Sequence, residues 1–319
     1  MMTRPALLAW AAAAIVALAY PFVVDPYWLT VGILALFYAL VTASWTLLVG
    51  YAGQFSFGHM GFVALGAYAS ALLARYASLP IPLAALAAIA LCLVVGAAIG
   101  GICLRMRGPY LAIFTLAFAE VLRIVITTEN EVTGGSGGFQ AATLFHGRSD
   151  IPYYMVALGL LAFTLAALGW MIVSRWGLFF RAIRENERAA AASGVRVVRF
   201  RVLAFAISSG FAGLAGAFYA HYIGMLTPDI GSVDQMGLVV AMAVIGGSES
   251  LTAAVLGALA VEALVEALRA YGQWRLVLFG ALLLLTMRFA RNGLLALAWE
   301  QVRRLPGLRR PRGTAEPAR

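Results

Sequence analysis

The sequence contains no lysine, so its 23 basic side chains are all arginines. A P-loop needs a lysine on the nucleotide phosphates, and this absence excludes ATP hydrolysis by that motif. Any ATP-driven step must therefore come from partner proteins. Charged residues are also scarce, at 12% of the chain against 63% hydrophobic residues, and the mean hydropathy is +0.90. This composition excludes a water-soluble domain and predicts a protein that lies in a bilayer.

Cysteine and histidine are too few and too far apart to build a reactive site. Cys92 and Cys103 lie in one predicted helix, about 16 Å apart along its axis, so they cannot form a disulfide with each other. His59, His146 and His221 are scattered, and the chain has no Glu-x-x-His, Cys-x-x-Cys or Gly-x-Ser-x-Gly motif. We expect no catalytic residue, no metal site and no cofactor, and hence no enzyme.

Apolar runs long enough to cross about 30 Å of hydrocarbon recur along nearly the whole chain. They are continuously apolar, unlike the alternating strands of a β-barrel. The sequence predicts an all-α, polytopic transmembrane bundle of about ten spans in one domain, residues 1–291, followed by a basic cytoplasmic tail at 292–319. The predicted spans are residues 6–24, 29–49, 57–75, 82–104, 110–128, 152–174, 202–220, 236–247, 251–268 and 274–291.

Two of these segments allow a second interpretation. Residues 236–247 could form a re-entrant half-helix, but we expect a short crossing shielded by neighbouring helices, because a re-entrant segment would place the arginine-rich tail outside. Residues 1–24 carry Arg4, an apolar stretch and Ala-Leu-Ala at 17–19, which also describes a cleavable signal peptide. We expect a retained helix there.

The arginines are distributed unequally between the two sides of the predicted bundle. With the amino terminus inside, most of them fall in cytoplasmic segments, including the loop 175–201 and the tail. The outer side holds only Arg75, Arg123, Arg148, Arg269 and Arg275. The positive-inside rule favours this orientation, with both termini cytoplasmic. Anionic membrane lipid explains the net charge of +9 on that face, and we expect no nucleic-acid partner.

The most polar membrane segment reads GYAGQFSFGHMGFVALGAY, residues 50–68. Its glycines allow close backbone approach, and its polar side chains would be costly in lipid if unpaired. They should face protein or a watery path, where the free N–H groups of a helix start attract a carboxylate. Two interpretations remain open: Gly53, Gln54, Ser56 and His59 line a translocation path, or they only pack helices together.

Charged residues also occur inside predicted spans. Glu120 lies about midway through its helix and Arg123 follows one turn later, so the two could form an i,i+3 pair. Intramembrane charges are functional candidates by default, which makes Glu120 a further candidate for the path. A purely structural pair is the alternative. Glu262, Glu266 and Arg269 share a helix face, and Glu266 with Arg269 is expected to form an interfacial pair.

Two loops are long enough to meet partners. The inner loop, SRWGLFFRAIRENERAAAASGVRVVRFRVLAF, predicts a helix from Phe179 to Ala192, ended by Gly194. Phe179 and Ile183 would present an apolar knob, and the helix would either lie flat on the membrane or fill a socket on a cytoplasmic motor. The outer loop, 129–151, has a glycine-rich run suited to docking or gating, or is a plain connector.

Four stretches resemble one protein family: GYAGQFSFGHMGFVALGAYASALL, LRMRGPYLAIFTLAFAEVLRIV, TGGSGG and FRAIRENERAAAASGVRVVRFRVLAFAISSGFAGLAGAFYA. They resemble the branched-chain amino-acid ABC importer permeases of the LivM type, over roughly residues 45–295. The resemblance implies a bacterial inner-membrane subunit that is paired with a second homologous permease, driven by two ATPase subunits and fed by a periplasmic substrate-binding protein.

The resemblance also implies roles for residues in the two loops. The inner loop becomes a coupling helix that contacts the ATPase through Arg181, Arg184, Glu185, Arg188, Ala189, Ala190 and Gly194. Ala189, Ala190 and Gly194 follow the importer pattern Glu-Ala-Ala-x-x-x-Gly, and Arg188 stands where the acid is usual. In the outer loop, the residues expected to dock the binding protein are Thr133, Gly134, Gly135 and Ser136.

One segment departs from the family. Residues 246–258 read GGSESLTAAVLGA, where the family usually has Gly-Gly-x-Gly-x-Leu-x-Gly-Pro-x-x-Gly-Ala. Glu249 replaces a glycine, and Ala253-Ala254 replaces Gly-Pro. We therefore expect a less kinked turn, and the family's usual substrate does not follow automatically.

Together these observations predict a non-catalytic permease that moves a branched-chain or related amino acid by alternating access, with partners supplying ATP hydrolysis. The alternatives are an ion-coupled secondary transporter, with Glu120 or Glu262 as the coupling acid, and an ABC permease for urea or short amides. The predicted cytoplasmic helix counts against a secondary transporter, because a self-sufficient carrier does not need it.

Overall fold

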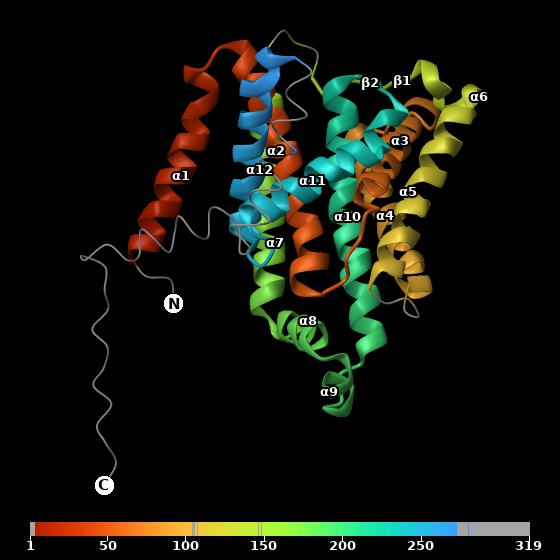
Figure 1. The fold of residues 1–319 in the computed structure, drawn as a ribbon. Coiled ribbons are helices and arrows are strands. Elements are labelled where there is room, and N and C mark those ends of the chain that lie inside the picture. The colour runs from red at the N-terminus through yellow and green to blue at the C-terminus, as the bar shows by residue number, and fades with distance from the viewer. Residues whose placement is uncertain are drawn as a thin grey trace.

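The structure, a computed structural model, describes residues 4–103, 106, 108–145, 147, 149–272 and 280; of residues 4–13, 270 and 271 it describes only the backbone. This part of the chain is helical apart from loops and one small sheet (Figure 1). Its longer helices are α1 (Arg4–Val23), α2 (Pro26–Thr46), α3 (His59–Tyr76), α4 (Ile81–Ile102), α5 (Pro109–Thr128), α7 (Ile151–Val173), α8 (Arg175–Glu185), α10 (Val197–Ile223), α11 (Val233–Gly246) and α12 (Leu251–Ala267). The short elements are η1 (Leu47–Tyr51), α6 (Asn130–Thr133), η3 (Gly135–Gly137), β1 (Phe139–Gln140), α9 (Glu187–Ala192), β2 (Met225–Leu226), η4 (Pro228–Gly231) and η5 (Leu268–Tyr271).

The helices coincide with the predicted spans as far as residue 268, which confirms the all-α class. The number of spans is not confirmed at ten. Five helical segments of the described chain are long and apolar enough to cross a membrane, and the bent pair α11 and α12 makes a sixth at most. The five are Pro26–Tyr51, α4, α5, α7 and α10. The predicted span 274–291 and the tail 292–319 lie outside the described residues.

Two predicted spans, α1 and α3, do not pass the test of length and hydropathy. α3 has 18 residues, and His59 and Arg75 near its two ends make it more polar than the five segments that pass. α1 enters the comparison only through its described part, Ala14–Val23, which is apolar but short. A polar helix can still lie at membrane depth where neighbouring helices cover it, and 11 of the 18 residues of α3 are buried.

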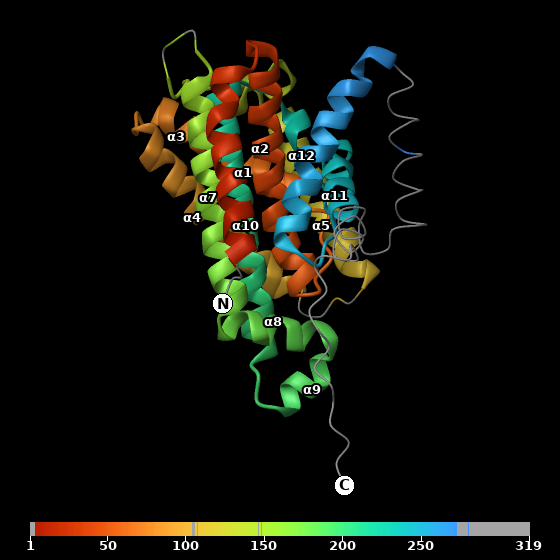
Figure 2. The same cartoon turned by 90° about the vertical axis from the view of Figure 1, so that its left-hand side faces the viewer.

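The helix α10 lies at the centre of the bundle and packs against α3 and α4 without room for side chains at several positions. A Cβ atom on Gly66 would overlap the carbonyl of Gly213, and one on Gly216 would overlap the carbonyl of Val63. Small residues thus bring the α3 and α10 backbones into contact, as is typical of membrane helices. Figure 2 shows α3 and α4 at one edge of the bundle and α12 at the opposite edge.

At one end of the bundle the glycine-rich loop is folded. Its strand β1 pairs antiparallel with β2, which follows α10, with Phe139 opposite Leu226. The guanidinium of Arg75, near the end of α3, lies 5.2 Å from the centre of the Phe139 ring. Gly134, with φ 74°, and Gly135, with φ 54°, make the tight turns that lead into the strand. The loop is therefore anchored to α3 and α10.

At the other end, α8 and α9 project beyond the membrane helices (Figure 1). The single helix predicted from Phe179 to Ala192 is wrong, because the chain breaks at Asn186 (φ −155°, ψ 100°). The Asn186 side chain accepts a hydrogen bond from the backbone N–H of Ala189, at 3.1 Å, and so caps α9. The predicted end at Gly194 is confirmed: its φ is +84°. The Val195 N–H donates to the Ala190 carbonyl at 3.1 Å, as in a Schellman cap.

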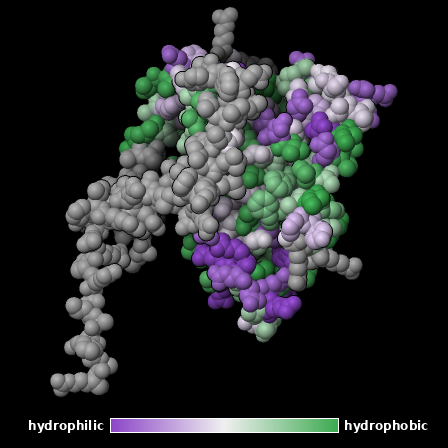
Figure 3. All heavy atoms as spheres, viewed as in Figure 1, coloured by the Kyte–Doolittle hydropathy of each residue, from purple (hydrophilic) through white to green (hydrophobic). Residues whose placement is uncertain are grey.

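The outer surface of the bundle carries the apolar band that a membrane protein needs. Figure 3 shows hydrophobic side chains over the middle of the molecule and hydrophilic ones at the end where α8 and α9 lie. On α5 an exposed stripe at helical spacing includes Tyr110, Ile113, Val121 and Ile124. These side chains would contact lipid or another membrane helix.

α11 and α12 meet at a bend of 120°. Such a pair is either a broken span or a re-entrant loop. The turn between them, residues 247–250, lies against α8, so the carboxyl end of α11 is on the side of the bundle where α8 projects. The short crossing expected for 236–247 stays a prediction.

Candidate functional site

The helix α8 packs its apolar side chains into the membrane body. The rings of Phe179 and Phe180 lie 4.7 and 6.1 Å from the ring of Phe200 on α10. Phe180 and Ile183 are buried. The apolar knob predicted at Phe179 and Ile183 is therefore wrong, because an amphipathic helix gains stability by covering this face against the neighbouring helix. This contact joins α8 to α10.

The opposite surface of α8 and α9 is open. Glu185, Arg188, Ala189 and Gly194 are exposed, whereas Ala190 is buried. A Cβ atom added at Gly194 would meet no atom of the described chain within 4 Å. Hydrophilic side chains gather at this end of the molecule (Figure 3), and the exposed residues of α8 and α9 are accessible there.

The two remaining predicted coupling residues, Arg181 and Arg184, fold back toward the membrane helices. Nη2 of Arg181 donates to the carbonyl of Ile172, at 3.1 Å. Its guanidinium lies 5.7 Å from the centre of the Tyr51 ring. Tyr51 is the last residue of η1, a π-helical turn, and such turns are frequent at functional sites. Arg181 thus ties α8 to the end of the span that begins with α2.

Arg184 connects α8 to two other segments. Its Nη1 donates to the Gly50 carbonyl of η1, and its Nη2 donates to Oε1 of Glu249 at 3.2 Å. Glu249 lies in the turn between α11 and α12. A Cβ atom on Gly53, whose φ is +67°, would lie 2.7 Å from Cγ of Arg184. Only glycine allows this approach of the 50–54 segment to α8.

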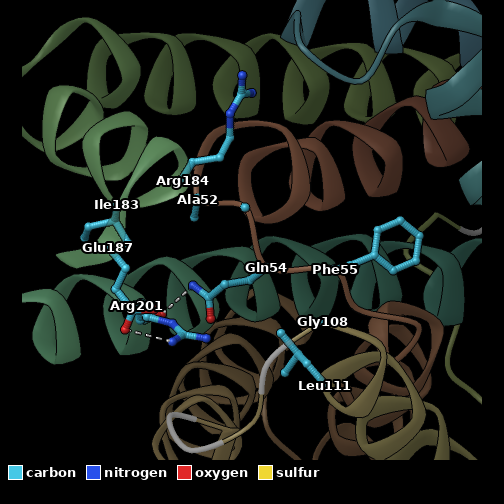
Figure 4. A pocket seen from close by; sticks show the side chains of 10 residues that line it. Ala52, Gln54, Phe55, Gly108, Leu111, Ile183, Arg184, Glu187 and Arg201 are labelled. Atoms are coloured by element: carbon cyan, nitrogen blue, oxygen red, sulfur yellow. Dashed lines mark hydrogen bonds and ion pairs between the residues drawn. The ribbon is translucent and has the colours of Figure 1, made fainter. Parts of the chain in front are cut away.

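A cavity of about 280 Å³ opens between α8, α9 and the membrane body. On one wall, Nη1 of Arg201 lies 3.5 Å from Oε1 of Glu187, and Nε2 of Gln54 donates to the Arg201 carbonyl at 3.1 Å. Figure 4 shows these three side chains together, with the guanidinium of Arg184 pointing away from them. The cavity is lined by Ala52, Gly53, Gln54, Phe55, Gly108, Leu111, Ile183, Arg184, Glu187 and Arg201.

Ser56 and His59 lie deeper and do not line this cavity. Oγ of Ser56 accepts from the N–H of Gly58 at 3.1 Å. Nε2 of His59 lies 2.6 Å from Oγ of Ser208, which in turn donates to the carbonyl of Ser44 at 2.5 Å. Both side chains are fully buried among helices, and only Nδ1 of His59 lacks a hydrogen-bond partner. Their contacts join α2, α3 and α10.

Glu120 lies elsewhere, on α5, and the predicted i,i+3 pair with Arg123 is confirmed. Nη2 of Arg123 lies 2.5 Å from Oε1 of Glu120. Their side chains are 35% and 30% exposed, beside the apolar stripe of α5. A partly exposed ion pair in a spanning helix is costly in hydrocarbon, so this edge of α5 would be covered by protein or water. The predicted path residues therefore fall into three separate groups.

Whole-chain comparisons agree with this architecture. The chain is 30% identical to the high-affinity branched-chain amino acid transport system permease protein LivM of Escherichia coli (strain K12), over 91% of this chain and 75% of that protein. The LivM protein of Salmonella typhimurium matches equally. The pattern of the family described as branched-chain amino acid transport system / permease component matches residues 27–287. The chain belongs to this permease family.

Relatives of lower identity are named as permeases for another solute, autoinducer 2. The autoinducer 2 import system permease protein LsrC of Salmonella typhi is 27% identical over 64% of this chain and 61% of its own length. No solved structure matches the chain. The matched region of the permease family, residues 27–287, includes α8, α9 and the cavity beside them.

In this permease the residues predicted to dock a binding protein are only partly accessible. Oγ1 of Thr133 is buried and donates to the Ile126 carbonyl at 2.7 Å. Gly135 is buried too, and its N–H donates to the Glu129 carbonyl at 3.1 Å. Ser136 is exposed. Thr133 and Gly135 shape the turn, and Ser136 is the residue of this run that a partner can touch.

Sequence reasoning missed Arg201, Glu187 and Leu111, which line the cavity. Arg201 falls at the end of the predicted cytoplasmic loop 175–201, yet α10 begins at Val197 and buries it. A signal was present: Arg201 shares a helical face with Ala204, Phe205 and Ser208, which are all buried. An arginine that continues an apolar face indicates a paired, buried cation.

Proposed function

We propose that the chain is the membrane-spanning permease subunit of an ATP-driven importer in a bacterial inner membrane, with both termini cytoplasmic, and that it moves branched-chain or related amino acids. Membership of the permease family supports this proposal, and so does the α8–α9 pair, which is packed on the membrane helices and open on its other side. The LsrC relatives are named for the import of autoinducer 2, a solute other than the one in the name of the LivM relatives. Substrate class is therefore the finer part of the proposal.

The proposed assembly holds a second homologous permease, two ATPase subunits and a periplasmic substrate-binding protein. The ATPase would contact α8 and α9 through Glu185, Arg188, Ala189 and Gly194, which are exposed. Ser136, in the folded loop at the other end of the bundle, would face the binding protein. The observation that carries the proposal is this polarity: one end bears a projecting, capped helix pair, and the other bears an anchored glycine-rich turn.

The proposal is tested by expressing the chain together with the neighbouring transport genes and purifying the complex in detergent. We expect an ATPase to remain bound, and the reconstituted complex to take up leucine only when ATP and the binding protein are both present. The matched control is the chain alone in liposomes under a proton or sodium gradient, where we expect no uptake. Gradient-driven uptake by the chain alone would show a secondary transporter instead. Uptake of urea or a short amide in place of leucine would correct the substrate class.

We further propose that the path runs along the edge of α5 that carries Glu120 and reaches the inner end beside Gly53 and Gln54, with Ser56 and His59 behind its wall. Glu120→Gln should lower uptake about fivefold, because roughly 1 kcal/mol of favourable charge interaction is lost. The decisive control is the double variant Glu120→Gln/Arg123→Gln, measured in the same uptake assay. A path role for Glu120 keeps uptake low in the double variant. Restored uptake there would mean that the ion pair is only structural.

A further inference from the structure

The cavity beside α8 has two chemically different walls. One wall carries an ion pair and an amide, from Arg201, Glu187 and Gln54. The rest of the lining is mostly apolar or glycine, including Leu111, Ile183 and Phe55. Arg184 also lines the cavity, but its guanidinium points away from the ion pair (Figure 4). Its volume of about 280 Å³ is close to the lower end of ligand pockets, which span roughly 300–1,000 Å³. The cavity therefore suits a small molecule with one polar and one aliphatic end.

The charges on the polar wall restrict the ligand further. Arg201 is only 8% exposed, and its contact with Glu187 is 3.5 Å, longer than the roughly 2.7–2.9 Å of a strong charge-assisted hydrogen bond. A lone anion beside Arg201 would be repelled by Glu187, and a lone cation beside Glu187 would be repelled by Arg201. A ligand that carries a carboxylate and an ammonium close together pairs with both residues and adds no net charge beside the buried Arg201.

The position of the cavity links such a ligand to the movement of α8. Ile183 and Glu187 belong to α8 and α9, whereas Gln54, Leu111 and Arg201 belong to the membrane body. A molecule held by Glu187 and Arg201 would bridge the two parts and resist their separation. The cavity also lies where the proposed path reaches the inner end of the bundle, so a released substrate would meet it first.

We infer that this cavity is a product site: it binds a zwitterionic amino acid with an aliphatic side chain from the cytoplasmic side, and its occupancy holds α8 against the membrane body and slows import. This inference deepens the proposed function and depends on it for the role of α8. The carboxylate is bound by Arg201 and the ammonium by Glu187, while Leu111 and Ile183 cover the side chain.

Binding is tested with the whole complex in nanodiscs, free of nucleotide and of the binding protein, by titrating L-leucine in a calorimeter. Two analogues serve as matched probes: 4-methylpentanoate lacks the ammonium, and 3-methylbutylamine lacks the carboxylate. We expect leucine to bind, and each analogue to bind at least about tenfold more weakly, because each loses one charge-assisted contact. Equal affinities for the three compounds, or no heat from leucine, would overturn the inference.

The role in regulation is tested in proteoliposomes that hold ATP and unlabelled leucine inside, with labelled leucine and the binding protein outside. Preloaded leucine should lower the initial rate of uptake, and preloaded 4-methylpentanoate should not. Leu111→Trp, which fills the cavity, should remove this inhibition, so that the variant imports at the same rate with and without preloaded leucine. An unchanged rate on preloading, in a preparation that imports leucine normally, would overturn the inference and leave the proposed function intact.

A second variant covers the case in which tryptophan at residue 111 prevents assembly. Glu187→Gln keeps the size of a side chain that is 35% exposed and removes only its charge. We expect this variant to bind leucine and 4-methylpentanoate with equal affinity, because the ammonium has lost its partner. If Glu187 had only a structural role, its replacement would weaken the binding of leucine and of 4-methylpentanoate by the same factor. The variant would then still prefer leucine, and this result would contradict the proposed site. If the complex imports nothing at all, the proposed function fails, while the binding titration still decides this inference.

Discussion

Replacing Gly194 with leucine should lower uptake roughly tenfold or more while ATP hydrolysis by the complex continues, because leucine adds about 1–2 kcal/mol of left-handed strain and a bulky side chain at the proposed ATPase contact. Gly194 has φ +84° and ends α9. No atom of the described chain would lie within 4 Å of its new Cβ, so the clash would be with the partner. The measurement is the ratio of leucine imported to ATP hydrolysed in proteoliposomes.

Two controls separate the strain at Gly194 from the bulk of the new side chain. Gly194→Asn keeps a residue that tolerates the left-handed conformation and should retain most of the uptake. Gly169→Leu adds the same bulk on α7, at another position where an added Cβ meets nothing within 4 Å, and should change neither uptake nor ATP hydrolysis. An unchanged ratio in Gly194→Leu would mean that this end of α9 does not touch the ATPase.

The outline of the fold was predictable because membrane helices are set by local composition. Continuous apolar runs gave the positions of the helices to within a few residues, and glycine after Ala192 gave the end of α9. The pairing of Glu120 with Arg123 also depends only on spacing along one helix, and it was predicted correctly. In each case the physical cause lies within one or two turns of the chain.

Features that depend on tertiary contacts were not predictable in this way. Propensity alone favours one helix through Asn186, yet its side chain caps α9 and divides the segment. The π-helical turn at Leu47–Tyr51 is stabilised by contacts with α8 and the 247–250 turn, which a single sequence does not reveal. The burial of Arg201 follows from an earlier start of α10 and from its neighbour Glu187. The number of spans also depends on tertiary contacts, because a polar helix such as α3 can lie at membrane depth when neighbouring helices cover it.

The predicted path residues illustrate the same limit. Polarity in a membrane segment shows that Gln54, Ser56 and His59 need partners, but it does not say which. The structure divides them: Gln54 lies at the cavity, whereas Ser56 and His59 bond to neighbouring helices. Gly58 packs closely against α5, because an added Cβ atom would lie 2.9 Å from the carbonyl oxygen of Thr115. Part of the segment therefore serves packing, and the path role of Gly53 and Gln54 stays a proposal.

Replacing Arg184 with alanine should lower the import-to-ATP ratio roughly 2- to 30-fold, the range expected for about 0.5–2 kcal/mol of lost coupling. Arg184 joins α8 to the Gly50 carbonyl and to Glu249, so its loss removes one link from α8 to η1 and the link to the turn before α12. Glu249→Gln should have a smaller effect. The Glu249 side chain is 77% exposed, and an exposed ion pair contributes at most about 1 kcal/mol.

A double-mutant cycle distinguishes this link from two independent contacts. Arg184→Glu/Glu249→Arg restores the charge pair but leaves the Gly50 carbonyl without its donor, so uptake should recover only in part. The variants Arg184→Ala and Glu249→Gln should combine non-additively in the import-to-ATP ratio, while thermal unfolding of the complex changes little in either. If the effects of the two variants on this ratio are additive, Glu249 does not take part in the coupling through Arg184. The expected result would mean that the turn at residues 247–250 moves with α8, because Glu249 in this turn binds the side chain of Arg184.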